Sequence, residues 1–264
     1  MSRKTGVKDR RSPLDKDIKV RTKMAYIKKQ YRMKNVIEVE EYHTGRYGAP
    51  GQVRKKKKKL TPEQMARVNQ KNKEKKCRRK LRAHFDVGDY FTDLTYAKDA
   101  RPPDMETAKK HFGDFLKIVR REYKKRGKEL KWIRNIEVGQ RNAWHVHLVI
   151  NRIQDTDLII RKAWKMGKVI IQNLTSDGEF KRLAEYITKE PTEENSLVES
   201  DYSSSRNLPL PEPEKHVYKR WKTWKENPRI PEGWYLDKDS LFEGENPVTG
   251  YPYRTYSLFR IQRE

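Results

Sequence analysis

Cysteine and long apolar runs are nearly absent from this sequence of 264 residues. Cys77 is the only cysteine, which excludes an intrachain disulfide and a zinc site built from cysteines. No apolar run approaches the roughly 18 residues that a membrane-spanning helix needs. The N-terminus has Lys and Arg but lacks the apolar segment of a secretion signal. We therefore expect an unsecreted protein, without membrane contact, in a reducing cytoplasm.

Apolar residues are also few, since 34% of the chain is hydrophobic and 38% is charged. The core must therefore be local, and much of the chain must be solvated or lie on a polyanion. Of the net charge of +25, most lies in residues 1–80, which hold 28 Lys and Arg and 8 Asp and Glu. Such a segment binds phosphate backbones through counterion release. The alternative is a basic tail that only aids solubility or contacts RNA and acidic membranes unselectively.

Residues 1–84 are predicted to form a basic, partly disordered N-terminal extension. Residues 36–42 alternate in a way that indicates a short extended piece. Thr61 followed by Pro62 is typical of a helix start, which predicts a basic helix over about residues 62–82. The lysine run 55–59 immediately precedes that helix, and we expect it to bind nucleic acid.

Residues 193–264 are predicted to be an irregular C-terminal linker and extension. Serines at 203–205 and prolines at 209, 211 and 213 mark the linker. Residues 215–225, which contain Trp221 and Trp224, are predicted to form a short helix. The sequence has no internal repeat.

Residues 85–192 carry alternating strand and helix patterns and are predicted to form the catalytic domain. The expected strands cover residues 90–96, 130–138, 144–150 and 168–174, and the expected helices cover 104–125, 158–165 and 179–190. The strands over 130–138 and 144–150 are joined by Gly139 to Asn142, which is typical of a hairpin. The order β-α-β-β-α-β-α predicts an α+β fold with a ferredoxin-like, split βαβ antiparallel sheet covered by helices.

Two histidines share one face of the strand over residues 144–150. Side chains alternate along a strand, so His145 and His147 point to one face and Val146 to the other. Glu137 lies across the short turn, and cross-strand neighbours come within about 5 Å. A His, His, Glu cluster is a credible three-ligand metal site with positions open to water or substrate. For the histidine pattern alone, the alternative is a pair packed or hydrogen-bonded on the sheet without a metal.

The predicted helix over 179–190 carries a tyrosine outside its apolar stripe. The stripe consists of Phe180, Leu183, Ala184 and Ile187, and the nearly opposite face carries Arg182, Tyr186 and Lys189. The two cations would favour the phenolate and bind a phosphate, as a tyrosine nucleophile with an ordinary pKa near 10 requires. The alternative is an ordinary surface tyrosine that lies beside a lysine.

Three motifs together resemble the HUH endonucleases, which are the rolling-circle replication initiators (Rep proteins) of phages, plasmids and small single-stranded DNA viruses. Residues 91–96 are similar to the first-strand motif, residues 144–148 to the His-hydrophobe-His metal motif, and residues 186–189 to the Tyr-x-x-Lys nucleophile motif. The motifs occur in the family's order, over about residues 89–190. Asp93 departs from the apolar residue common at its position, so its side chain is unexplained.

The resemblance implies that His145 and His147 bind a divalent metal, Mg²⁺ or Mn²⁺, with Glu137 as the third ligand. Tyr186 would attack the scissile phosphate of single-stranded origin DNA, and Lys189 would orient or stabilise the site. The products would be a 5′-phosphotyrosine and a free 3′ hydroxyl, and the reverse reaction would rejoin the strand at termination. The DNA would also be bound by Lys55, Lys56, Lys57, Lys58, Lys59 and Arg182.

The chain is similar to the single-tyrosine initiators, because positions 182 and 190 hold Arg and Glu rather than a second tyrosine. Termination would then need a second subunit, and hence a homodimer, or a water. The sequence has no Gly-x-x-x-x-Gly-Lys-Ser/Thr motif, which excludes a helicase module of the kind attached in some viral relatives. A host helicase and a host polymerase are therefore expected partners, in the cytoplasm of a bacterial cell.

Two alternatives share part of this pattern. A conjugative relaxase or a transposase would use the same chemistry, but relaxases typically place the tyrosine before the histidine motif, whereas Tyr186 follows it. A non-catalytic single-strand binder would stack bases on sheet aromatics such as Tyr96 and Trp144. That alternative leaves the presence of Glu137 and the two histidines unexplained.

Overall fold

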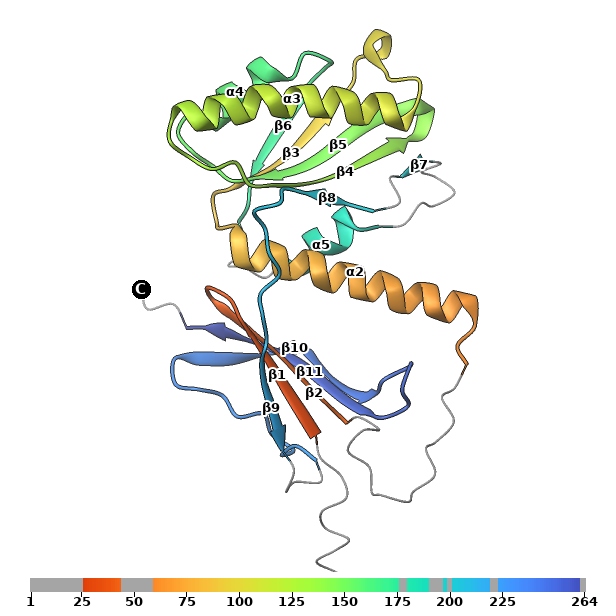
Figure 1. Cartoon of the computed structure of the whole chain (residues 1–264), viewed down its shortest axis with the longest axis vertical. Coiled ribbons are helices and arrows are strands. Elements are labelled where there is room, and N and C mark those ends of the chain that lie inside the picture. Colours follow the sequence, from red (N-terminus) through yellow and green to blue (C-terminus); the bar gives the residue numbers. More distant parts are fainter. Residues whose placement is uncertain are drawn as a thin grey trace, which may run out of the picture. The chain divides into compact units, whose positions relative to one another are not determined.

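The computed structural model describes residues 26–43, 59–175, 180–189, 197–198, 201–218 and 223–261 (Figure 1). Helices and antiparallel sheets make the fold α+β, as expected. The described residues form two compact units: a central unit within residues 33–35 and 62–211, and a terminal unit within 1–32, 36–61 and 212–264. No helix in the described ranges is both long enough and apolar enough to cross a membrane.

The central unit is built on an antiparallel sheet in the order β6-β3-β5-β4-β7, with β8 also paired to β4. Its strands are β3 (Tyr90–Thr95), β4 (Trp132–Gly139), β5 (Ala143–Ile150), β6 (Val169–Asn173), β7 (Leu197–Val198) and β8 (Ser203–Ser204). Figure 1 shows α3 (Met105–Lys125) and α4 (Thr156–Ala163) over one face, and α2 (Pro62–His84) and α5 (Lys181–Ile187) over the other. The elements predicted between residues 62 and 174 are confirmed, with ends within two residues.

The sheet face under α3 and α4 is apolar. Leu94, Val146 and Leu148 are fully buried on it, together with residues that recur at helical spacing on α3. Helix α3 begins where Asp104 accepts a hydrogen bond from the Thr107 amide at 2.7 Å. It ends before Gly127, whose φ of +63° is a conformation that glycine adopts without strain. The predicted stop signal therefore acts as expected.

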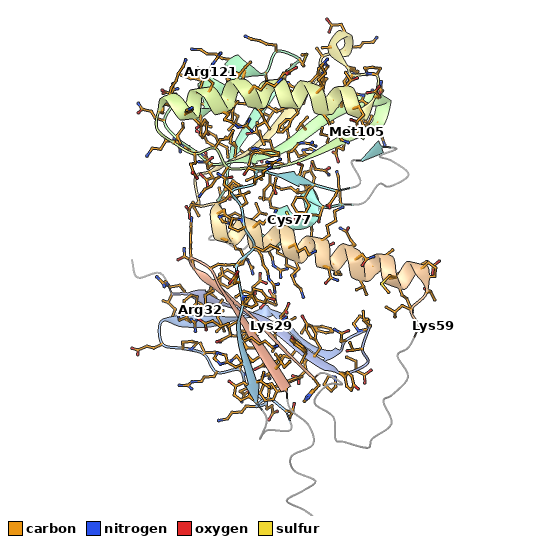
Figure 2. The ribbon with its side chains drawn as sticks, viewed as in Figure 1. Lys29, Arg32, Lys59, Cys77, Met105 and Arg121 are labelled. Carbon is orange, nitrogen blue, oxygen red and sulfur yellow. The ribbon has the colours of Figure 1, made fainter. Side chains whose placement is uncertain are left out.

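The opposite sheet face packs against α2 and α5. Its apolar cluster joins Cys77, Leu81 and Phe85 to Ile133, Val149, Leu174, Phe180, Ala184, Ile187 and Leu208. Cys77, labelled in Figure 2, is fully buried on α2. Helix α5 is shorter than the predicted 179–190, because it covers only Lys181–Ile187.

The hairpin predicted between β4 and β5 is confirmed, and a short 3₁₀ turn, η3 (Gln140–Asn142), closes it. Arg141 and Asn142 both have positive φ angles, of 58° and 57°. This backbone follows the right-handed twist of the strands, which is why two-residue hairpin turns favour it. The turn sets the register that pairs Glu137 with His145. A second 3₁₀ turn, η2 (Lys98–Ala100), follows β3.

The terminal unit is a five-stranded antiparallel sheet in the order β10-β11-β2-β1-β9. Its strands are β1 (Tyr26–Arg32), β2 (Val36–His43), β9 (Glu214–Tyr218), β10 (Trp234–Glu245) and β11 (Pro252–Arg260). Val39 and Tyr256 lie opposite each other in its core. Arg254 is buried beside them and bonds the Glu41 carboxylate at 2.6 and 2.8 Å, so the buried charge has a partner.

The terminal unit corrects two predictions. The C-terminal extension is not irregular where it is described, since β9, β10 and β11 lie within it. The helix expected over 215–225 is wrong at its start, because residues 214–218 form β9 and pair with β1. Pairing with a strand almost 190 positions away overrides the local helical pattern, and Tyr218 stacks on Tyr26 with ring centroids 4.5 Å apart.

The division of the chain also differs from the predicted segments 1–84, 85–192 and 193–264. Strands from both ends of the sequence share one sheet, while α2, which was grouped with the N-terminal extension, lies in the central unit. The extended piece predicted at 36–42 is confirmed as β2.

Candidate active site

The candidate site lies on the sheet face that α2 and α5 partly cover. His145 and His147 share this face, because side chains alternate along β5. Their rings are parallel, with centroids 6.1 Å apart. The register places Glu137 of β4 opposite His145, and Asp93 of β3 opposite His147. Three neighbouring strands therefore bring two imidazoles and two carboxylates together.

His147 is held by a carboxylate at each ring nitrogen. Its Nδ1 lies 2.5 Å from Asp93 Oδ1, and its Nε2 lies 2.7 Å from Glu137 Oε1. Burial lowers the pKa of His147, but the hydrogen bonds to Asp93 and Glu137 outweigh it and raise the pKa above its ordinary value. For His145, burial is the main cause of a lowered pKa, followed by the neighbouring His147. The two histidines thus differ in electrostatic environment.

Glu137 connects His147 to Lys189. Its second oxygen, Oε2, forms an ion pair with Lys189 Nζ at 2.5 Å. Burial raises the pKa of Glu137, but the hydrogen bonds from His147 and Lys189 outweigh it and lower the pKa to about 2. The carboxylate is therefore charged at neutral pH, as a metal ligand or a lysine partner must be.

Tyr186 projects from α5 toward His147. Its hydroxyl lies 3.1 Å from His147 Nε2 and 3.4 Å from Nδ1, and the two rings meet edge to face at 4.8 Å. The Phe91 ring contacts Tyr186 edge to face at 5.9 Å, and Lys189 Nζ lies 4.6 Å above the Tyr186 ring. The tyrosine is nevertheless 39% exposed, so its hydroxyl is fixed without being sealed from a substrate.

The expectation that two cations would favour the phenolate is not met. Burial raises the pKa of Tyr186 above its ordinary value, and the charges of Glu137 and Asp93 raise it further. Lys189 is paired with Glu137, and Arg182 is exposed one helical turn before Tyr186. In this arrangement the hydroxyl stays protonated, so attack by its oxygen requires the proton to be removed during the reaction.

The structure brings together five of the residues that the sequence singled out: Glu137, His145, His147, Tyr186 and Lys189. Of the proposed DNA-binding residues, Lys59 is exposed just before α2, where Figure 2 labels it. Lys55, Lys56, Lys57 and Lys58 lie outside the described residues. Sequence reasoning missed the roles of Asp93 and Phe91, because these roles depend on the pairing of β3 with β5.

The donor set has the chemistry of a divalent-metal site. In the described residues, no three His, Cys, Asp or Glu side chains surround a single point in a ready-made arrangement. However, His147 Nε2 and Glu137 Oε1 face each other at 2.7 Å, close to the separation of about 3 Å between two ligands that each lie about 2.1 Å from one ion. Asp93 holds the other ring nitrogen of His147, as a carboxylate behind a metal-bound histidine commonly does. The residues therefore fit a metal by their chemistry.

Comparison with known proteins gives one finding. No curated protein and no solved structure matches the chain. Residues 89–191 match a family model that describes replication-associated proteins of the ORF2 class. This segment runs from the start of β3 past the end of α5 and contains Asp93, Glu137, His145, His147 and Tyr186. The candidate active site therefore lies entirely within the part of the chain that is similar to replication-associated proteins.

Proposed function

We propose that the protein is a rolling-circle replication initiator of the HUH type, which nicks single-stranded origin DNA and rejoins it at termination. One observation carries the proposal: the Tyr186 hydroxyl lies 3.1 Å from His147, inside a cluster of two histidines and two carboxylates. The match to replication-associated proteins over residues 89–191 supports the biological role. The strand order β6-β3-β5-β4 supports the fold, because it is the order of a split βαβ, ferredoxin-like sheet.

The proposed reaction is a transesterification. The Tyr186 oxygen forms a bond to phosphorus, and the bond between phosphorus and the 3′ oxygen of the preceding nucleotide breaks. The phenol loses its proton to solvent and the departing 3′ oxygen gains one, so charge and atoms balance. The DNA 5′ end remains on the enzyme as a phosphotyrosine, and the free 3′ hydroxyl can prime a polymerase. Attack by the same hydroxyl on the phosphotyrosine reverses the reaction.

Glu137, His145 and His147 are the residues that would hold a Mg²⁺ or Mn²⁺ ion, which when bound withdraws charge from a non-bridging phosphate oxygen. The protein's own contribution is positional. His147 and Phe91 fix the Tyr186 ring from two sides and hold the hydroxyl where a phosphate above the cluster can meet it. Lys189 lies within reach of the same phosphate, because its Nζ is 4.6 Å from the Tyr186 ring, so it can offset developing negative charge.

The proposal is tested by trapping the covalent product. The protein is incubated with single-stranded DNA from its own replicon and Mn²⁺, and an adduct is sought on a denaturing gel. We expect an adduct with the wild type and with Tyr235→Phe, an exposed tyrosine of the terminal unit, but none with Tyr186→Phe. An adduct that persists in Tyr186→Phe assigns the nucleophile elsewhere. Retained DNA binding with no adduct from the wild type on any strand favours the non-catalytic binder.

A further inference from the structure

Helix α5 is too short to be stable by itself, and its position depends on what it packs against. It has seven residues, Lys181–Ile187, whereas isolated helices shorter than about 12 residues are marginal in water. Its first residue is preceded by Phe180 in the left-handed conformation, with no side-chain cap. Tertiary contacts must therefore hold it, and with it the Tyr186 and Lys189 side chains.

Helix α2 supplies several of those contacts, although it lies outside the segment that matches replication-associated proteins. Cys77 and Leu81 are fully buried in the apolar cluster that also contains Ala184 and Ile187 of α5. These contacts hold the N-terminal and middle parts of α5 against the sheet. They are not directional, so they do not fix how the C-terminal end of α5 is turned.

A directional contact is made at that end by Gln70 of α2. Gln70 Nε2 donates a hydrogen bond to the backbone oxygen of Thr188 at 2.7 Å, across 118 positions of sequence. Thr188 is fully buried, and its own hydroxyl bonds the Ala184 oxygen at 2.7 Å. A carbonyl at a helix C-terminus has no partner within the helix, so a buried one needs an outside donor. Gln70 is that donor.

Thr188 stands between the two functional side chains of this segment, two positions after Tyr186 and one before Lys189. Fixing its carbonyl fixes the peptide planes from which both side chains project. Gln70 is itself oriented, because its Nε2 also donates to Glu74 Oε1 at 3.1 Å, and Lys71 pairs with Glu74 at 3.4 Å. The Gln70 oxygen is buried and has no hydrogen-bond partner among the described residues, so only the donor end of the amide is used.

We propose that Gln70 is a positioning residue of the nuclease: it anchors the C-terminal end of α5 and so aims Tyr186 and Lys189 at the scissile phosphate. The inference rests on the proposed function for its kinetic consequence, but not for its structural one. It extends the site to a helix outside residues 89–191. Misplacing a nucleophile by about 1 Å can lower a rate by about a hundredfold without weakening substrate binding.

The test compares substitutions of Gln70 that differ only in hydrogen bonding. Gln70→Ala removes the donor. Gln70→Glu keeps the size but replaces the donor by an acceptor that also faces Glu74. Gln70→Lys restores a donor long enough to reach the Thr188 oxygen and loses nothing, because the glutamine oxygen has no partner among the described residues. Asn72→Ala, on an exposed position of the same helix, is the matched amide control.

We expect Gln70→Ala and Gln70→Glu to lower the single-turnover rate of adduct formation at saturating DNA by roughly ten- to hundredfold, with the Kd for the oligonucleotide changed less than about twofold. Gln70→Lys should recover most of the rate, and Asn72→Ala should match the wild type. In hydrogen exchange measured by mass spectrometry, peptides covering residues 184–189 should exchange faster in the Ala and Glu variants, with peptides of α3 unchanged.

The two measurements separate failure of this inference from failure of the proposed function. If the wild type forms no adduct, the proposed function fails, and hydrogen exchange still decides whether Gln70 anchors α5. If the wild type forms the adduct and Gln70→Ala leaves both rate and exchange unchanged, the inference is overturned while the proposed function stands. A uniform rise in exchange across α3 and α5 would indicate general loss of stability and would also overturn it.

Discussion

On β5, Val146 and Leu148 face α3 and α4, whereas His145 and His147 face α2 and α5. The two sheet faces are made by alternate residues of the same strands, so they share one backbone and one register. The first face is filled with fully buried apolar side chains. The second combines an apolar cluster with polar groups that bond one another and with an exposed tyrosine.

The difference indicates how the protein separates stability from chemistry. Burial of apolar area stabilises the fold without needing exact geometry. Polar groups such as Asp93 and Glu137 stabilise it only if each is satisfied, and they are satisfied by His147 and Lys189. Changes on the first face should therefore act on stability, and changes on the second face on the reaction.

The strongest test of this separation is His147→Ala. This change removes the group that contacts Asp93, Glu137 and the Tyr186 hydroxyl. We expect adduct formation to fall by about a thousandfold or more, which corresponds to about 4 kcal/mol of transition-state stabilisation. Single-turnover assays with Mn²⁺ measure the loss, and circular dichroism checks that the fold is kept. A loss below tenfold in a folded variant would remove His147 from the active site.

The neighbouring residue gives the opposite prediction. Leu148→Ala opens a cavity under α3, because Leu148 is fully buried, and should lower the free energy of unfolding by about 2–5 kcal/mol. The folded fraction should retain adduct formation at a similar rate. Urea unfolding, with activity measured well below the transition, distinguishes the two effects. Loss of activity without loss of stability would show that the faces are not separate.

Local pattern predicted the central unit well because its elements are short-range. Alternation placed His145 and His147 on one face, and the Gly139–Asn142 turn fixed the pairing of Glu137 with His145. Helical spacing likewise set Tyr186 apart from the apolar stripe. Each of these inferences needs only residues within about ten positions of one another, where periodicity and turn chemistry dominate.

Longer-range features could not be predicted in the same way. The bond between Asp93 and His147 spans 54 positions and depends on which strands are neighbours. The pairing of β11 with β2 in the terminal unit spans more than 200 positions, and alternation in either strand does not name its partner. The pKa of Tyr186 was misjudged for the same reason, since the carboxylates that raise it come from other strands.

Asp93→Asn tests whether a residue behind the site acts on chemistry rather than on stability. The change keeps the shape but removes the charge that bonds His147 Nδ1 at 2.5 Å. If the cluster binds a metal, affinity for Mn²⁺ should fall by about ten- to a hundredfold, as for other partners of metal-bound histidines. Calorimetric titration of Mn²⁺ measures this without DNA. Unchanged affinity, with Glu137→Gln as the sensitive comparison, would make Asp93 a purely structural residue.

The smallest effect on either face is expected from the lysine run 55–59, which belongs to neither. Replacing all five lysines by serine removes charges that bind phosphates without positioning them, so the slope of log K against log salt should fall by up to about 3.5, at about 0.7 per phosphate contact on single strands. Cleavage of a short saturating oligonucleotide should change by less than about twofold. Because this run binds the strand and the sheet face reacts with it, an equal loss of binding and of cleavage would show that the run takes part in the reaction itself.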